Sequence, residues 1–296
     1  MPDPMTRAGV RELIQAHGLR TKKKLGQHFL VDKHVAGKIL AAAEIRPSDL
    51  VLEIGPGLGG LTQGLASAAG HVVAVELDKT LVEVLEDMFQ NSPVTIVQGD
   101  ILRMDLSKIL PPWDDSVKVV ANLPYYITTP VIFFLFESGI RFESVTVMVQ
   151  KEVAKRIVAV PGTKDYGALT LAANYYADAE IVANVPVNSF MPRPAVDSAV
   201  VKFQLLDKPR AEGDKDFLFK VIHAAFGKRR KTLVNALDSE GLGGEGGKMR
   251  LADILSALGI DTQVRGETLD IHGFAKLAAE LSKPSNPSAV PNNSQT

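Results

Sequence analysis

The strongest constraint on the fold of this 296-residue chain is a regular alternation of short apolar runs with amphipathic helical patterns, which extends from Asp49 to about Leu206. Such alternation is typical of a mainly parallel sheet flanked by helices. We therefore predict an α/β fold for this part of the chain. The predicted strands cover residues 50–54, 72–76, 94–98, 117–121, 145–150, 181–185 and 199–205.

Residues that favour helix ends separate these strands. Asp32 and Asp78 each stand at the N-cap position of a helical pattern, and Thr128 begins another that carries Pro130 in its first turn. Gly70 stands where a further helical pattern ends. One more helix is expected before the sheet, over residues 7–17.

The chain after Leu206 has a different composition and no strand alternation. Its helical patterns cover residues 217–226, 231–237, 251–258 and 274–281. We therefore predict that residues 1–206 form an N-terminal extension plus an α/β catalytic domain and that 207–283 form a small all-α domain. The polar, proline-broken residues 284–296 predict a disordered tail, and the glycine-rich residues 241–247 a flexible loop.

Composition excludes several classes of protein. The chain has no cysteine, which removes disulfides and thiolate zinc sites, and its six histidines show no paired metal-ligand spacing. We expect no metal. Apolar runs are too short to span a membrane, so a cytoplasmic protein is expected. The formal net charge of -1 means that any polyanion would be met by local clusters, and residues 22–24 and 228–231 are two such clusters.

A glycine-rich loop follows the first predicted strand. Gly55, Gly57, Gly59 and Gly60 lack Cβ atoms and so let a ligand approach the backbone and the start of the next helix. The same stretch also fits the G-x-G-x-x-G pattern of dinucleotide-binding folds. A nucleoside-binding enzyme and an NAD-dependent oxidoreductase are both open at this point.

Acidic residues end the second and third predicted strands. Glu76 can accept protons from ribose hydroxyls, and Asp100 can accept a proton from an adenine amino group or cap the turn before Ile101. Ligands in open α/β sheets bind outside the carboxyl ends of the strands. We therefore expect Gly55, Glu76 and Asp100 to line one crevice.

The fourth strand runs into Asn122, Leu123, Pro124 and Tyr125. An exocyclic adenine amine is a poor nucleophile, and two acceptors outside the ring plane would make its lone pair more available. The Asn122 side chain and the Leu123 backbone each offer a carbonyl, and Pro124 adds no competing N–H donor. Tyr125 can stack on the base. The alternative is a simple exit from a strand into a turn.

Seven patterns in a fixed order carry a family resemblance. They are KKKLGQHFLVD, LEIGPGLGGLT, VELD, QGDIL, NLPYYITTP, NSFMPRPAVDSAVV and AAFGKRRKTLVNAL. Together they resemble the ribosomal RNA adenine dimethyltransferase family, from Thr21 to Leu237. The resemblance implies a Rossmann-like methyltransferase sheet whose last strand is antiparallel, a small helical C-terminal domain, and S-adenosyl-L-methionine as the methyl donor.

The resemblance also assigns roles to matching positions. The donor-binding residues that it implies are Gln27, His28, Leu30, Gly55, Gly57, Glu76, Leu77, Asp100, Ile101 and Asn122. Many family members carry Asn at the position of His28, where a backbone carbonyl could make the contact equally well. The implied catalytic residues are Asn122, Leu123, Pro124, Tyr125 and Phe190. Phe190 would close the second face of a flipped adenine opposite Tyr125, or pack beneath a proline-rich turn instead.

Basic residues predict where RNA would be held. The candidates are Lys22, Lys23, Lys24, Lys151, Arg193, Lys228, Arg229, Arg230 and Lys231. Any one of them could equally be a solvated surface residue, and the second cluster could brace a domain interface.

The resemblance implies dimethylation of N6 of two adjacent adenosines near the 3′ end of 16S rRNA, in the small ribosomal subunit or its assembly intermediate. We expect a monomer. Three alternatives are a large-subunit rRNA methyltransferase of the macrolide-resistance type, an NAD-dependent oxidoreductase and a non-catalytic assembly factor.

Overall fold

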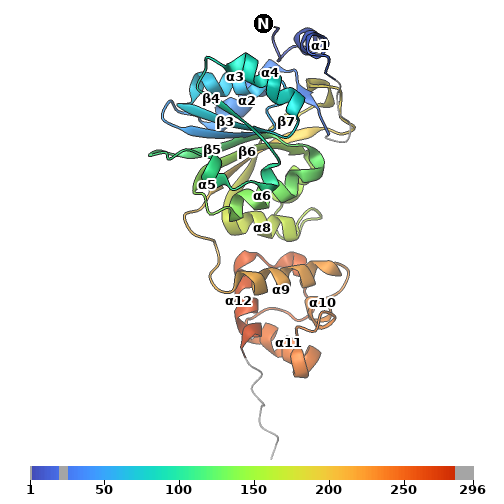
Figure 1. Cartoon of the computed structure of the whole chain (residues 1–296). Coiled ribbons are helices and arrows are strands. Elements are labelled where there is room, and N and C mark those ends of the chain that lie inside the picture. The colour runs from blue at the N-terminus through green and yellow to red at the C-terminus, as the bar shows by residue number, and fades with distance from the viewer. Residues whose placement is uncertain (1, 20–25, 284–296) are drawn as a thin grey trace, which may run out of the picture. The chain divides into compact units, whose positions relative to one another are not determined.

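A computed structural model of the chain describes residues 2–19 and 26–283 (Figure 1). It divides into two compact units, which we describe separately. Residues up to Val158 and Ala177–Leu206 form the first unit, and Ala159–Tyr176 with the residues from Asp207 form the second. The segment Ala159–Tyr176 thus groups with the helical unit, whereas the sequence prediction places it in the first domain. The predicted tail, 284–296, lies outside the described residues.

A seven-stranded sheet forms the centre of the first unit. Its strand order is β4 (Val94–Gln98), β3 (His71–Glu76), β2 (Leu50–Ile54), β5 (Val117–Asn122), β6 (Phe142–Gln150), β9 (Ser198–Leu205) and β7 (Ala177–Val185). Strands β4, β3, β2, β5 and β6 run parallel to one another, and β9 is antiparallel to both β6 and β7. The predicted fold class is confirmed, including the antiparallel last strand.

The strands are almost wholly apolar because helices cover both faces of the sheet. Every residue of β2 is buried. Figure 1 shows α2 (Lys33–Ala43), α3 (Gly60–Ala68) and α4 (Lys79–Phe89) on one side of the sheet, with α5 (Leu106–Ile109) and α6 (Thr128–Glu137) on the other. This doubly covered arrangement leaves the strand ends as the place where polar side chains can gather.

Two of the predicted N-caps are confirmed, whereas α3 ends at Ala68 with Ala69, and not Gly70, as its C-cap. The Asp32 carboxylate accepts hydrogen bonds from the N–H groups of the first turn of α2, and Asp78 accepts from Thr80 N at the start of α4. Helix α6 begins at Thr128 as predicted, but a 3-10 turn, η3 (Tyr125–Ile127), precedes it and leads directly out of β5. The first helix, α1 (Arg7–Ala16), has Thr6 as its N-cap.

A buried ion pair joins two strands at their amino ends. Lys118 Nζ lies 2.9 Å from Asp49 Oδ2, and both side chains are inaccessible to solvent. The same ammonium donates a hydrogen bond to the carbonyl of Glu44 at 2.7 Å. Burial would raise the pKa of Asp49, but hydrogen bonds from Ser116 and Lys118 outweigh it and hold that pKa below its usual value. These hydrogen bonds favour the ionised form of the Asp49 carboxyl group in spite of its burial.

The second unit is a helical bundle with its own core. Its helices are α8 (Ala168–Tyr176), α9 (Lys215–Gly227), α10 (Leu233–Asp238), α11 (Gly247–Ala257) and α12 (Ile271–Ser282). Tyr166, Leu171 and Tyr175 are buried in that core, and the Tyr166 hydroxyl donates to the carbonyl of Leu269. This packing explains why Ala159–Tyr176 belongs to the helical unit.

Two predicted features of the second unit differ in detail. Helix α10 begins at Leu233 because Thr232 caps it, so residues 228–231 lie in the turn after α9 and not on a helix. The glycine-rich residues 241–247 contain a 3-10 turn, and Gly247 is already the first residue of α11.

The buried ion pair generates a stability prediction. Lys118→Ala leaves the Asp49 carboxylate buried without its partner, and we expect it to lower the free energy of unfolding by about 3–5 kcal/mol. Urea unfolding followed by circular dichroism measures the change. The matched control is Lys108→Ala, which removes an exposed ion pair with Asp105 and should cost less than about 1 kcal/mol. Equal losses in the two variants would contradict the importance of the buried pair.

Candidate functional site

A pocket of about 1100 Å³, a volume that includes the space at its mouth, opens at the carboxyl ends of β2, β3 and β5. All the predicted donor-binding and catalytic residues line it, from Gln27 to Phe190. The structure therefore brings the predicted donor-binding and catalytic residues together around one pocket.

The glycine loop forms one wall of the pocket. Gly55 and Gly57 have positive φ angles of 70° and 62°, which favour glycine. A Cβ on Gly57 would lie 3.1 Å from the Phe29 ring, so this ring packs closely against the loop and leaves little room for a larger residue. Helix α3 begins just after the loop and has no side-chain cap, which leaves its first N–H groups for a ligand. This cradle fits the methyl donor that the family implies.

Glu76 ends β3 on the same side of the pocket. Its carboxylate accepts hydrogen bonds from Gly57 N at 3.2 Å and from Asp78 N at 2.9 Å, and the side chain is only 7% exposed. Burial raises the pKa of Glu76, while these backbone hydrogen bonds act against the rise. Each carboxylate oxygen keeps a second lone pair, with which it could accept a ribose hydroxyl.

Asp100 lines the pocket and caps a turn at the same time. Its Oδ1 accepts a hydrogen bond from Leu102 N at the start of η2 (Ile101–Arg103), and Oδ2 lies 3.5 Å from Arg103 Nε. The turn-cap alternative for Asp100 is therefore confirmed. Ile101 is buried beside it and offers an apolar surface to the pocket.

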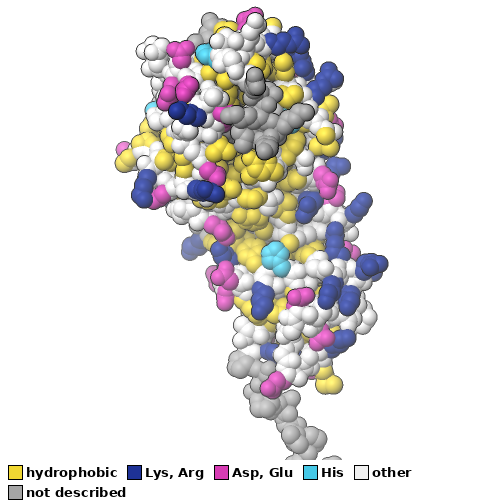
Figure 2. Space-filling view, turned by 45° about the vertical axis from the view of Figure 1, so that its right-hand side comes forward, with side chains coloured by type: hydrophobic (Ala, Val, Ile, Leu, Met, Phe, Trp, Pro, Cys, Tyr) yellow, Lys and Arg dark blue, Asp and Glu magenta, His cyan; other side chains and the backbone are white. Residues whose placement is uncertain are grey.

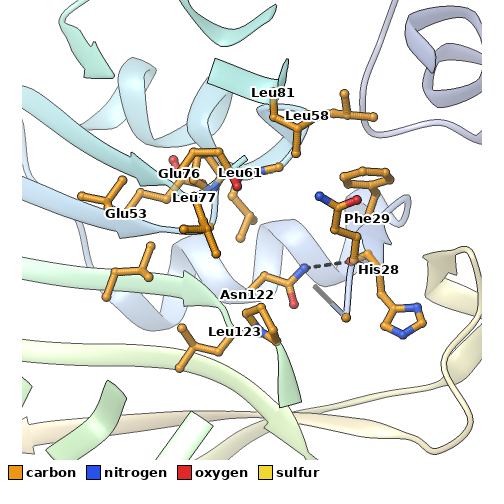
Figure 3. Close-up of a pocket in the computed structure, with 18 of the residues that line it drawn as sticks. His28, Phe29, Glu53, Leu58, Leu61, Glu76, Leu77, Leu81, Asn122 and Leu123 are labelled. Carbon is orange, nitrogen blue, oxygen red and sulfur yellow. Dashed lines mark hydrogen bonds between the residues drawn. The ribbon is translucent and has the colours of Figure 1, made fainter. Parts of the chain in front are cut away.

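Asn122 ends β5 in the middle of the pocket (Figure 3). Its Nδ2 donates a hydrogen bond to the backbone carbonyl of His28 at 3.1 Å. Because that carbonyl can only accept, it selects the nitrogen end of the amide and turns Oδ1 away from His28. The amide oxygen is thereby held in one orientation, as an acceptor for a donor group in the pocket.

A small second sheet holds the His28 segment in place. β1 (Phe29–Leu30) pairs antiparallel with β8 (Phe190–Met191), so that Leu30 lies opposite Phe190. Gln27 Nε2 also donates to Asp78 Oδ2 at 3.0 Å. The N-terminal segment is thus tied both to the strand that carries Phe190 and to the start of α4.

The ring of Tyr125 contacts a second ring that the sequence analysis did not predict, that of His28. The His28 ring stacks on Tyr125, with centroids 6.0 Å apart and an interplanar angle of 25°. The Tyr125 hydroxyl shares a hydrogen bond of 2.7 Å with Ser198 Oγ, and His28 Nδ1 lies 2.8 Å from the carbonyl of Pro192. Phe190 is 1% exposed and belongs to the core, although it also lines the pocket. Tyr125 therefore already has a stacking partner, which is His28 and not Phe190.

Sequence reasoning missed two residues of this site. Ser198 positions the Tyr125 ring, and the sequence gives no local signal for it. Glu53 lines the pocket and is 1% exposed. Its signal was available, since it is the one charged residue in the apolar run of β2.

The predicted RNA-binding residues lie in several places. Residues 22–24 lie outside the described residues. In the first unit, Lys151 is partly buried and its backbone N–H donates to Asp197, while Arg193 is exposed. In the second unit, Lys228, Arg230 and Lys231 are exposed. Figure 2 shows several Lys and Arg side chains on one face of that unit.

Arg229 has a structural role within the helical unit. Its guanidinium donates hydrogen bonds of 2.8 Å to the carbonyls of Lys164 and Tyr166 and lies 3.9 Å from Glu267. It braces the segment before α8 against the turn after α9. The Arg229 guanidinium thus binds groups of its own unit. For the exposed neighbours Arg230 and Lys231, the structure gives no such side-chain contact within the described residues.

Two kinds of feature are absent from the described residues. Across residues 2–19 and 26–283, no group of three or more His, Asp or Glu side chains is placed to hold a metal ion. Within the same ranges, no helix has both the length and the apolar character needed to cross a membrane.

Comparison with known sequences gives a consistent family. A sequence model of the ribosomal RNA adenine dimethylase family matches residues 18–277. A protein from Lachnoclostridium phytofermentans named ribosomal RNA small subunit methyltransferase A is 49% identical over 272 residues, which cover 90% of this chain and 93% of that protein. A protein of the same name from Shouchella clausii is 44% identical, with coverage of 94% and 96%.

Solved structures agree with the sequence relatives. A dimethyladenosine transferase from Plasmodium falciparum superposes with a TM-score of 0.73 at 28% identity, covering 85% of this chain and 96% of that one. The 23S rRNA methyltransferase ErmE gives a TM-score of 0.65 at 25% identity, covering 86% and 99%. Both likenesses extend over most of the two chains.

Glu53 generates a prediction about pH and stability. Burial raises the pKa of Glu53 from 4.5 to about 8, so the folded state holds its proton more tightly than the unfolded state. The stabilisation is complete below pH 4.5 and is lost as the pH rises towards about 8. Glu53→Gln keeps the shape without titrating, and its melting temperature should fall less than that of the wild type over this window. Parallel curves for the two proteins would show that Glu53 titrates normally.

Proposed function

This chain belongs to the ribosomal RNA adenine dimethylase family, and on that premise we propose that it dimethylates N6 of two adjacent adenosines near the 3′ end of 16S rRNA. The family makes it an S-adenosyl-L-methionine-dependent rRNA adenine dimethyltransferase. The names of its relatives favour the small ribosomal subunit as the carrier of the target. We place the reaction in the cytoplasm, on the subunit or its assembly intermediate.

The observation that carries the catalytic assignment is the fixed orientation of the Asn122 amide. With Nδ2 bound to the His28 carbonyl, Oδ1 is the end that can accept a hydrogen bond from the target amine. The backbone carbonyl of Leu123 is the second candidate acceptor, and Pro124 supplies no N–H to compete for it. Two such acceptors outside the base plane would favour a pyramidal N6 with its lone pair available for attack.

When bound, S-adenosyl-L-methionine supplies a methyl group already activated on a positively charged sulfur. The protein then needs no general base before the attack, because the proton can leave N6 after the new N–C bond has formed. Its residues contribute mainly by positioning, which can supply about 7–11 kcal/mol of the barrier reduction. Glu76 would hold the ribose of the donor, and Asp100 and Ile101 its adenine.

The target adenine would stack on the ring of Tyr125, which Ser198 holds by its hydroxyl. The His28 ring covers one face of the Tyr125 ring, with the two ring centroids 6.0 Å apart. Stacked rings lie about 3.5 Å apart, so a base inserted between two rings needs a separation of roughly 7 Å. The present separation is therefore too small to admit a base between His28 and Tyr125. We infer that the base uses the remaining face or displaces His28. Phe190 would then support the pocket floor from the core.

Exposed basic residues are the candidate phosphate contacts. Arg193 in the first unit and Lys228, Arg230 and Lys231 in the second are exposed. Arg229 contributes less in this scheme, because its guanidinium already serves two carbonyls of its own unit. We propose that the protein acts as a monomer, since the donor cradle and both candidate acceptors for the target amine belong to the first unit.

The alternatives are less well supported. The likeness to the 23S rRNA methyltransferase ErmE keeps the large-subunit alternative testable, but the cited sequence relatives carry the small-subunit name at higher identity. An NAD-dependent oxidoreductase would explain the glycine loop and Glu76 but not the fixed amide of Asn122. A non-catalytic assembly factor would have no need for that amide or for the donor cradle.

Incubation of the purified protein with labelled methyl donor and unmethylated subunits tests the proposed target. We expect two dimethylated adenosines near the 3′ end of 16S rRNA in 30S particles, located by mass spectrometry of RNA fragments. The 50S particles serve as the control and should remain unlabelled. Labelling confined to 50S particles would favour the macrolide-resistance type, and no transfer to either would favour the assembly factor.

Asn122→Ala tests the catalytic assignment. The substitution removes the oriented acceptor, and we expect methyl transfer to fall at least ~100-fold, as when one aligned polar group is lost from an active site. RNA affinity, measured by filter binding, should not change. Asn184→Ala makes the same chemical change at an exposed position of β7 and should keep full activity. An active Asn122→Ala enzyme would refute the role of the amide.

A further inference from the structure

Glu53 is a buried acid that the reaction described above does not use. It is the fourth residue of β2 and lies between Ala74 of β3 and Val120 of β5. The side chain is 1% exposed but lines the pocket, on the same side as Glu76 and Leu77 in Figure 3. Its neighbours on the strand are all apolar.

The carboxyl group of Glu53 is incompletely satisfied. Oε2 is buried and has no hydrogen-bond partner among the residues that the structure describes, and the same holds for Thr62 Oγ1 on α3. Thr62 lies close enough to lower the pKa of Glu53 slightly but does not meet hydrogen-bond geometry. An orphaned buried oxygen is costly in a folded protein, so its presence in the wall of a pocket points to a ligand.

The charges around Glu53 are all of one sign or neutral. From β3 it faces Glu76, whose charge adds to the effect of burial, and from α3 it faces the uncharged Thr62. The other titratable groups that line the described pocket are Asp100, His28, Tyr125 and Tyr126, and no Lys or Arg of the described residues lines it. Among the residues that the structure describes, an ionised Glu53 would therefore have no compensating positive charge in the pocket.

We propose that Glu53 keeps its proton while the pocket is empty, releases it to solvent when the cationic methyl donor binds, and regains one after the methyl group has left. The donor carries a positive sulfur, which the by-product S-adenosylhomocysteine lacks. On binding, the O–H bond of Glu53 breaks and the resulting carboxylate faces a cation. After transfer the sulfur is neutral, and Glu53 binds a proton from solvent again.

This exchange would make the pocket discriminate between donor and by-product by charge. A fixed carboxylate would be costly in the empty pocket, and a permanently neutral residue would gain nothing from the positive sulfur. A carboxyl group that titrates near neutral pH is uncharged in the empty pocket, which avoids the cost of a buried charge. It can still ionise when the donor binds and then attract the positive sulfur. The inference rests on the methyl donor of the family and not on the RNA target, so failure of the 16S assignment would leave it standing.

Isothermal titration calorimetry in buffers of different ionisation enthalpy counts the protons released per ligand bound. At pH 7 we expect about one proton for S-adenosyl-L-methionine and close to none for S-adenosylhomocysteine. Donor affinity should rise with pH by up to about tenfold per unit below pH 8 and level off above it. Equal proton release for both ligands, or none for either, would overturn the proposal.

Glu53→Gln assigns the source of the proton. The amide has the same shape but does not titrate, so the variant should bind the donor without proton release and with an affinity that does not vary with pH. Release that persists in this variant would come from Glu76 and would refute the role of Glu53. Thr146→Val, which removes a buried unpartnered hydroxyl of β6 outside the pocket, is the control and should release protons like the wild type. Thermal unfolding at pH 6 checks that both variants fold.

Discussion

The parallel pairing of β2 with β3 and β5 determines where every polar group of the pocket lies. These three strands are buried on both faces and carry mostly apolar residues, with Glu53 and Lys118 as exceptions, so most polar groups of the pocket lie where the strands end. Their register brings the glycine loop, Glu76 and Asn122 to one edge of the sheet. The glycine loop and the oriented amide of Asn122 are therefore neighbours as a direct result of strand direction. The antiparallel β9 then supplies Ser198, which holds the Tyr125 ring from the other side.

Two buried acids, Asp49 and Glu53, lie near opposite ends of β2 and differ in whether the protein supplies partners for their charge. Asp49, just before β2, is buried with Lys118 and is held ionised by close hydrogen bonds. Glu53, four residues later, is equally buried but faces a pocket without a cation, and burial raises its pKa. At the amino end of β2, Lys118 and Ser116 pair with Asp49, and this pairing contributes to stability. At the carboxyl end, Glu53 has no such partner among the described residues, as expected of a group that a charged ligand would pair with.

Much of this arrangement could be predicted from local patterns. The strands 50–54 and 94–98 have the predicted ends, and Glu76, Asp100 and Asn122 all line the pocket, because apolar runs and the polar residues after them are short-range signals. The stack of His28 on Tyr125, the bracing role of Arg229 and the grouping of Ala159–Tyr176 with the helical unit depend on contacts between segments far apart in the sequence. No pattern within one segment indicates them.

The β1–β8 pair has a consequence for how ligands enter and leave. Phe29, Leu30 and Phe190 all line the pocket, and the backbone of Phe29 and Leu30 pairs with that of Met191 and Phe190. The two walls are thus hydrogen-bonded into one piece of backbone. In the proposed reaction, a displacement of one strand of this pair would move the other, so exchange of the methyl donor would be coupled to binding of the target RNA.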